Sequence, residues 1–300
     1  MDCTLFEKYC ISNNIKYKLS EPMREHTTFK IGGNADIFVC VNSVEQLEGV
    51  LKELKLLNIP YFILGKGSNL LVSDQGIEGA VITLSDMKQI SVSEEYITAM
   101  AGATLAAVCV AAAQNSLSGL EFAYGIPGGV GGALFMNAGA YGGEMSQVVI
   151  SAEYITSSGE TGKLDLKDME LGYRTSIFKT SDMIITSVTF KLIKGDSAEI
   201  RAKMDDYMGR RSSKQPLEYP SAGSTFKRPE GYFAGALIEK NNLKSYNIGG
   251  AMVSEKHAGF VINYNNATCK DVLQLIEHIT NVVYEADGVK LEKEVIFIGK

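Results

Sequence analysis

Apolar residues recur at helical spacing in several parts of the chain. Ser43 can cap a helix, and the apolar positions that follow it lie on one face: Val44, Leu47, Leu51, Leu54 and Leu57. Thr104 precedes an alanine-rich helix over residues 105–115, and further helices are predicted over residues 198–211 and 233–240. The longest amphipathic pattern begins after Thr268 and ends before Gly288, with one apolar face: Val272, Leu275, Ile276, Ile279, Val282 and Val283.

Short apolar runs between turn residues predict strands over residues 36–41, 61–64, 80–84, 89–92, 96–100, 148–156, 184–193, 251–253, 259–263 and 291–298. A chain of 300 residues exceeds what one compact core usually holds. We therefore predict an α+β protein in four segments: an N-terminal helix and linker at 1–26, lobes at 27–78 and 79–195, and a third lobe at 196–300.

One uncharged stretch, residues 122–143, contains eight glycines and is bracketed by Glu121 and Glu144. Glycine at this density indicates backbone that needs positive φ or close packing, and it disfavours a membrane helix. A short helix is predicted over residues 130–138, with Gly139 as its stop. Bare backbone that leads into a helix suits a pyrophosphate, although a tightly packed core loop explains the composition equally well.

A second candidate phosphate loop, G-K-G-S-N, follows the predicted strand at 61–64. Its lysine lies between the glycines, so it is not a Walker A loop. Neither glycine-rich segment has the G-x-G-x-x-G spacing of a Rossmann dinucleotide site. The chain therefore has two phosphate-friendly loops, about sixty residues apart, that belong to no standard nucleotide fold.

Five motifs in one order resemble the UDP-N-acetylenolpyruvoylglucosamine reductase (MurB) family over residues 27–299. They are G-K-G-S-N-L-L, I-P-G-G-V-G-G-A-L-F-M-N-A-G-A-Y-G-G-E, G-Y-R-T-S, A-G-S-T-F-K-R-P and L-E-K-E-V-I-F-I-G. The resemblance implies a two-lobed FAD-binding fold of the PCMH/vanillyl-alcohol-oxidase type, residues 27–78 and 79–195, plus a C-terminal α/β substrate-binding lobe. It also implies non-covalent FAD, NADPH as electron donor, and reduction of UDP-N-acetylglucosamine enolpyruvate for the bacterial cell wall.

The resemblance assigns three catalytic residues. Arg174 would hold the substrate carboxylate, Ser224 would donate a proton to C2, and Glu294 would stabilise the intermediate. From residue type alone, each has an ordinary alternative: a solvated arginine, a turn serine and an exposed carboxylate at a strand end. Glu294 is expected in a buried strand over residues 291–298, where desolvation would raise its pKa.

The ligand contacts are assigned in the same way. The cofactor set is Gly65, Lys66, Gly67, Ser68, Asn69, Leu70, Ile126, Pro127, Gly128, Gly129, Gly132, Ala133, Asn137, Gly139, Ala140 and Gly143. The substrate set is Tyr141, Tyr173, Lys214, Gln215, Lys227 and Arg228. Residues 174–201 leave no room for the tyrosine-bearing lid of one form of the family, so we expect the shorter form.

The distribution of charge narrows the classes of partner that the chain can bind. The net charge of −6 argues against nucleic acid as a partner. Residues 201–300 carry 14 Lys and Arg against 12 Asp and Glu, a local excess that suits an anionic ligand. The basic residues singled out are Arg210, Arg211, Lys214, Lys227, Arg228 and Lys256.

The five cysteines form no C-x-x-C pair, which favours reduced thiols, and no signal peptide is recognisable. We therefore expect a cytoplasmic monomer without a membrane association. His26, His257 and His278 do not cluster, so no metal site is predicted, and His257 is expected near the ligand cleft. Two alternatives stay open: another flavin oxidase or dehydrogenase of the same fold, and a nucleotide-binding module without catalytic activity.

Overall fold

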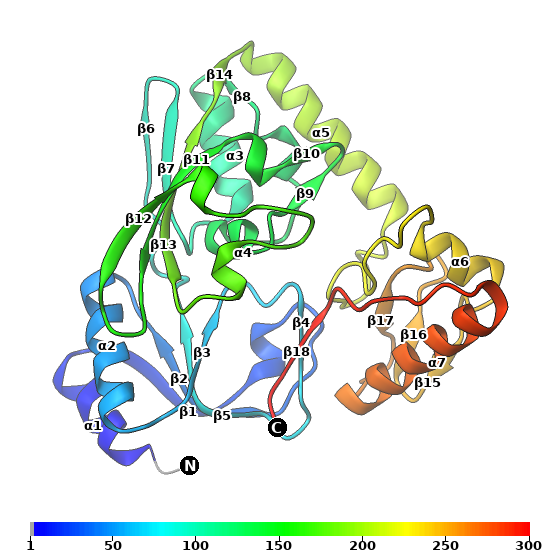
Figure 1. Cartoon of the computed structure of the whole chain (residues 1–300), viewed down its shortest axis with the longest axis horizontal. Coiled ribbons are helices and arrows are strands. Elements are labelled where there is room, and N and C mark those ends of the chain that lie inside the picture. Colours follow the sequence, from blue (N-terminus) through cyan, green and yellow to red (C-terminus); the bar gives the residue numbers. More distant parts are fainter. Residues whose placement is uncertain (1–2) are drawn as a thin grey trace. The chain divides into compact units, whose positions relative to one another are not determined.

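The computed structural model describes residues 3–300 (Figure 1). The chain forms two compact units that interleave along the sequence. The first unit contains residues up to 18, 37–66 and 79–211, and the second contains residues 19–36, 67–78 and 212–300. The four segments predicted from the sequence stay a prediction about domains, and their first two residues lie outside the described part.

A four-stranded sheet in the order β1-β2-β5-β3 forms the base of the first unit, and the ends of three strands continue into segments of the second. Helix α2 follows Ser43, whose hydroxyl accepts the N–H of Gln46 at 3.2 Å, as the sequence predicts. Its central apolar residues, Leu47, Leu51 and Leu54, are fully buried, and Val44 and Leu57 at its two ends are half-buried, which fixes the helix against the core. The elements are α1 (Thr4–Ser12), β1 (Lys16–Pro22), β2 (Asn34–Cys40), α2 (Val44–Leu56), β3 (Tyr61–Leu64) and β5 (Ile77–Thr83).

A five-stranded antiparallel sheet in the order β12-β11-β13-β7-β6 forms the rest of the first unit (Figure 1). Thr104 caps α3 as predicted, because its hydroxyl accepts the N–H of Ala107 at 3.1 Å. The elements are β6 (Ile90–Ser93), β7 (Tyr96–Met100), α3 (Leu105–Gln114), β8 (Leu117–Ser118), α4 (Val130–Phe135), β9 (Gly139–Ala140), β10 (Gly143–Glu144), β11 (Val149–Ile155), β12 (Thr161–Asp165), β13 (Ile184–Lys191), β14 (Ile193–Lys194) and α5 (Ser197–Lys214), whose last residues enter the second unit.

The second unit is built around the long helix α7. Thr268 caps it, Gly288 ends it in the left-handed conformation, and its apolar face packs with Phe29 and Ile31 in one core. The Asp74 carboxylate accepts the N–H groups of Cys269 at 2.8 Å and Lys270 at 3.1 Å. The elements are β4 (Leu70–Val72), α6 (Ala234–Lys240), β15 (Asn247–Ile248), β16 (Ala251–Val253), β17 (Val261–Asn263), α7 (Cys269–Asp287) and β18 (Ile296–Ile298), which pairs with β4 in parallel.

The structure corrects three sequence expectations. Strand β1 lies where only a helix and linker were expected, because its mostly exposed residues show no apolar alternation. Helix α4 ends at Phe135, so Gly139 is not its stop. The last strand covers only residues 296–298, and Glu294 precedes it in a segment whose residue Lys293 forms an isolated bridge with Phe226.

Two expected absences concern membrane-spanning helices and metal sites. No helix within residues 3–300 is both long enough and apolar enough to span a membrane. The same residues hold no cluster of three or more potential metal ligands.

We predict that Asp74→Ala lowers the free energy of unfolding by about 1 kcal/mol, because two N–H groups at the start of α7 lose their acceptor. Chemical denaturation followed by circular dichroism measures the change. Glu78→Ala is the matched control, since Glu78 is an exposed acid in the same segment. Equal stability of the two variants would contradict the capping role of Asp74.

Candidate active site

The glycine-rich stretch packs one edge of its backbone against residues 101–103 of the first unit. The N–H groups of Val130 and Gly131 donate to the carbonyls of Ala103 and Ala101, both at 2.9 Å. A Cβ on Gly131 would lie 2.9 Å from the Cβ of Ala101, so a larger residue would force the two segments apart. Gly132 differs, because a Cβ there would meet no atom within 4 Å. The stretch therefore presents bare backbone at Gly132 while it packs tightly at Gly131.

Gly65 and Lys66, the part of the G-K-G-S-N loop that belongs to the first unit, approach the same stretch. A Cβ on Gly129 would lie 3.8 Å from the Cγ of Lys66, and a Cβ on Gly65 would meet no atom within 4 Å. Within residues 3–300, the N–H group of Lys66 donates no hydrogen bond to another backbone group. Such an N–H group, with a nearby ammonium, can bind a pyrophosphate. The two candidate phosphate loops therefore meet at Lys66 and Gly129.

Asn137 supports the loop that carries Arg174 through its side chain. Its amide donates to the Gly172 carbonyl at 3.0 Å, and its oxygen accepts the N–H of Ser146 at 2.9 Å. The residue is 2% exposed. Asn137 is also predicted to contact the cofactor, and that contact stays a prediction beside these two protein hydrogen bonds.

Arg174 lies at the tip of a tight turn that this asparagine anchors. Gly172 and Thr175 exchange two backbone hydrogen bonds, of 3.1 and 3.2 Å, around Tyr173 and Arg174. Arg174 has a φ of +56°, and its guanidinium carbon lies 5.8 Å from the ring centroid of Tyr173. The Ser176 hydroxyl donates to the Phe135 carbonyl at 2.7 Å. The turn is thus held against the glycine-rich stretch from both sides, and its unusual backbone conformation is supported by that framework.

A pair of tyrosines and an arginine border the glycine-rich stretch in the first unit. The rings of Tyr141 and Tyr207 stack with centroids 4.5 Å apart. Arg211 packs against Gly125, where an added Cβ would lie 3.1 Å from its Cδ. Burial lowers the pKa of Arg211, and the nearby Tyr141 opposes this effect. Tyr207 was not predicted as a site residue and Arg211 only as part of a basic cluster; their spacing on one face of α5 was the available signal.

Ser224 and Glu294 belong to adjacent segments of the second unit. The N–H of Glu294 donates to the carbonyl of Thr225 at 2.9 Å, and the N–H of Lys227 donates to Glu292 at 2.8 Å. The Asn69 amide donates to the Glu294 carbonyl at 3.2 Å. The structure therefore brings the predicted proton donor, the predicted carboxylate and part of the phosphate loop together through their backbones.

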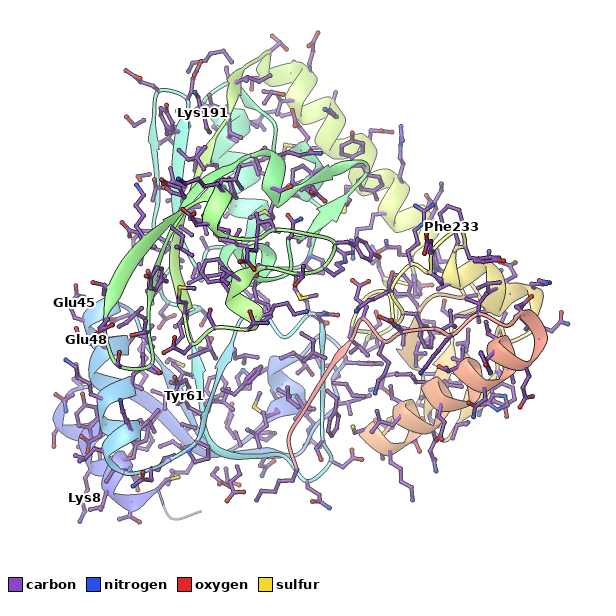
Figure 2. The ribbon with its side chains drawn as sticks, viewed as in Figure 1. Lys8, Glu45, Glu48, Tyr61, Lys191 and Phe233 are labelled. Carbon is purple, nitrogen blue, oxygen red and sulfur yellow. The ribbon has the colours of Figure 1, made fainter. Side chains whose placement is uncertain are left out.

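The four remaining substrate candidates also lie in the second unit. Lys227 forms an ion pair with Glu292 at 3.0 Å, and the Arg228 guanidinium lies 4.1 Å from the ring centroid of Phe233. Phe233 itself immediately precedes α6 and is 61% exposed (Figure 2). Lys214 is exposed at the end of α5. The Gln215 side-chain oxygen is buried without a hydrogen-bond partner in the described chain, which makes it available to a ligand donor.

The predicted residues thus form two groups, each described within its own unit. Arg174, Tyr173, Tyr141 and most of the glycine-rich cofactor set belong to the first unit, while Ser224, Glu294 and the basic residues belong to the second. A common cavity that joins the two groups stays a prediction.

Two family models match separate parts of the chain. Residues 35–165 match the family model of an FAD binding domain, and residues 215–298 match that of the UDP-N-acetylenolpyruvoylglucosamine reductase C-terminal domain. A reductase of that name from Clostridium perfringens strain SM101 is 51% identical over 282 residues, which cover 94% of this chain and 93% of the relative. The Clostridium novyi reductase is 48% identical over 297 residues, covering 99% and 95%.

A solved structure extends the likeness to three dimensions. The crystal structure of UDP-N-acetylenolpyruvylglucosamine reductase (MurB) from Thermus caldophilus matches with a TM-score of 0.80 at 33% identity, over 94% of this chain and 98% of that one. The expected resemblance, fold class and flavin dependence are confirmed. The chain therefore belongs to the UDP-N-acetylenolpyruvoylglucosamine reductase family and is an FAD-dependent oxidoreductase.

Proposed function

We propose that this protein uses NADPH and FAD to reduce UDP-N-acetylglucosamine enolpyruvate to UDP-N-acetylmuramate, a precursor of peptidoglycan. The observation that carries the proposal is the pairing of the Ser224–Thr225 segment with Glu294 in the second unit. Near-full-length relatives named for this reductase support the same substrate. A cytoplasmic, monomeric enzyme is part of the proposal, and five free cysteines agree with a reducing compartment.

The residues of the first unit fit FAD. Open space at Gly65 and Gly132 and the nearby Lys66 side chain form a cradle that side chains would fill at other positions. FAD supplies two-electron hydride chemistry when it is bound. The protein's own contribution is to hold the dinucleotide by its phosphates and to keep the substrate in register with it.

Arg174 and Ser224 take different parts in the reduction. The Arg174 guanidinium holds the enolpyruvyl carboxylate by paired hydrogen bonds and stabilises negative charge that develops beside it. The Ser224 hydroxyl transfers a proton to C2 of the enolpyruvyl group, while C3 receives the hydride. Glu294 stabilises the reacting group from the other segment of the pair.

The binding of the uridine nucleotide falls to basic and amide groups of the second unit. Lys214, Lys227 and Arg228 supply positive charge for the diphosphate, and the Gln215 oxygen accepts a donor from the ligand. The exposed Phe233 ring beside Arg228 offers an apolar surface next to this charge. Because this chain lacks the tyrosine-bearing lid segment, we propose that the start of α6, next to Phe233, covers part of the bound substrate.

We predict that the purified protein is yellow, because FAD stays bound without a covalent link. Addition of NADPH should bleach the visible flavin absorbance, and anaerobic addition of the enolpyruvyl substrate should restore it. A colourless protein that acquires no flavin spectrum with added FAD would favour a nucleotide-binding module. Bleaching without recovery would favour another oxidase or dehydrogenase of the same fold.

We predict that Ser224→Ala slows flavin reoxidation by the enolpyruvyl substrate by about 10²- to 10⁴-fold, because the proton donor is removed. Flavin reduction by NADPH should keep its normal rate in the same preparation. Stopped-flow absorbance measures both half-reactions, and Ser93→Ala, an exposed serine on β6, serves as control. Normal reoxidation in Ser224→Ala would exclude Ser224 as the donor.

A further inference from the structure

A tight turn at residues 254–260, S-E-K-H-A-G-F, lies beside the candidate proton donor in the second unit. The Ser254 hydroxyl accepts the N–H groups of Lys256 at 3.2 Å and His257 at 3.3 Å. Two backbone hydrogen bonds close the turn: Phe260 N–H to the His257 carbonyl at 3.0 Å, and Ser254 N–H to the Phe260 carbonyl at 2.9 Å. Ser254 is 1% exposed, so the turn is held in one conformation from inside.

The His257 ring accepts a hydrogen bond from within this turn. Its Nδ1 lies 3.1 Å from the Gly259 nitrogen, which donates its hydrogen. Nδ1 must therefore be unprotonated, which leaves the ring neutral with its proton on Nε2. The ring lies between Gly235 of α6 and Gly259, where added Cβ atoms would lie 3.4 and 3.0 Å from its Cε1, and it meets Phe260 edge-on at 4.9 Å. The imidazole thus has little room to reorient.

Gly259 connects this ring to the segment that carries Ser224. While its N–H donates to His257, its carbonyl accepts the N–H of Thr225 at 2.9 Å. The Thr225 hydroxyl accepts the N–H of Val261 at 2.9 Å, and the Thr225 carbonyl accepts the N–H of Glu294 at 2.9 Å. An unbroken series of contacts therefore runs from the His257 ring through Gly259 to the residue next to Ser224, and on to Glu294.

We propose that His257 is a positioning residue: its neutral ring fixes Gly259, and Gly259 in turn fixes the backbone that aims the Ser224 hydroxyl. This role rests on the proposed function of Ser224. His257 touches no reacting atom in this scheme, and its effect on the reaction passes through Thr225. Small displacements of a catalytic group are costly, so a loosened Gly259 contact should slow proton transfer.

The surroundings keep the ring in its accepting form at neutral pH. Burial lowers the pKa of His257 below its usual 6.5, Lys244 acts in the same direction, and a backbone hydrogen bond and Glu239 oppose them. Lys244 and Glu239 pair with each other at 2.6 Å at the end of α6. On the turn itself, Glu255 is exposed, and Lys256 pairs with Glu218 at 3.6 Å.

The direction of the pH effect follows from the lowered pKa. The contact with Gly259 is intact above pH 6.5 and is lost as the pH falls toward the lowered pKa, where Nδ1 gains a proton and faces another donor. Acidification should therefore loosen Thr225 and slow the Ser224 step while the rest of the fold persists.

Two variants distinguish the effect of the hydrogen-bond acceptor at residue 257 from the effect of its protonation. His257→Asn places an amide oxygen near the position of Nδ1 and does not titrate, whereas His257→Leu removes the acceptor. We expect His257→Leu to slow flavin reoxidation by the enolpyruvyl substrate about tenfold to a hundredfold, with normal flavin reduction by NADPH. His257→Asn should keep the neutral-pH rate and lose the acidic decline that we expect of the unmodified protein.

Amide hydrogen exchange supplies a readout that requires no turnover. The protection factors of Thr225 and Gly259, which correct the exchange rates for their intrinsic dependence on pH, should fall about tenfold in His257→Leu at pH 7, and in the unmodified protein as the pH falls, but not in His257→Asn. His278→Asn is the matched control, because His278 stacks on Tyr246 of another surface, with centroids 4.4 Å apart. It should behave as the unmodified protein in both measurements.

The outcomes distinguish this inference from the proposed function. Unchanged exchange and reoxidation in His257→Leu would overturn the positioning role, as would an undiminished acidic decline in His257→Asn. If His257→Leu does not fold, the results for His257→Asn alone decide whether His257 has the positioning role. A protein that fails to reduce the enolpyruvyl substrate contradicts the proposed function, and the exchange of Thr225 still decides whether His257 fixes that backbone.

Discussion

Every polar group of Thr225 is hydrogen-bonded, and the chemistry of the second unit depends on this residue. Its N–H, carbonyl and hydroxyl engage Gly259, Glu294 and Val261, each at 2.9 Å. At 4% exposure, any one of these groups left without a partner would cost about 1–3 kcal/mol. Three segments distant in sequence must therefore take one relative arrangement, and that arrangement sets the backbone of Ser224 and Glu294.

Buried polar residues also hold the segment around Arg174 in the first unit. Asn137 and Ser176 are buried polar residues whose side chains bond to backbone groups of the neighbouring segment. An arginine in a left-handed turn conformation is costly on its own, and these two bonds supply part of the compensation. In both units, buried polar residues hold the loops that carry the candidate catalytic residues, which are themselves partly exposed.

The sequence predicted local structure best where one face of an element is apolar. The helices after Ser43, Thr104 and Thr268 were placed with their caps, since periodicity and capping are local signals. Strand β1 was missed because its residues are mostly exposed, and the last strand was predicted too long because residues 291–295 are apolar enough to suggest a strand but make only one isolated bridge, at Lys293. The support given by Asn137 was hidden for a different reason: its partners Gly172 and Ser146 are known only once the chain is folded.

The glycines illustrate why a motif alone assigns too many ligand contacts. Gly131 packs so closely on Ala101 that its lack of a side chain serves the fold, and Gly67 has a positive φ and would place a side chain against the His26 carbonyl. Gly65 and Gly132 have no such neighbour, so packing within the protein does not explain their lack of a side chain. In a motif that serves both packing and binding, the positions with open space are those where a phosphate or ring of the dinucleotide best accounts for glycine. The sequence does not distinguish glycines that packing requires from glycines that leave space for a ligand. The neighbours of each glycine in the folded structure do.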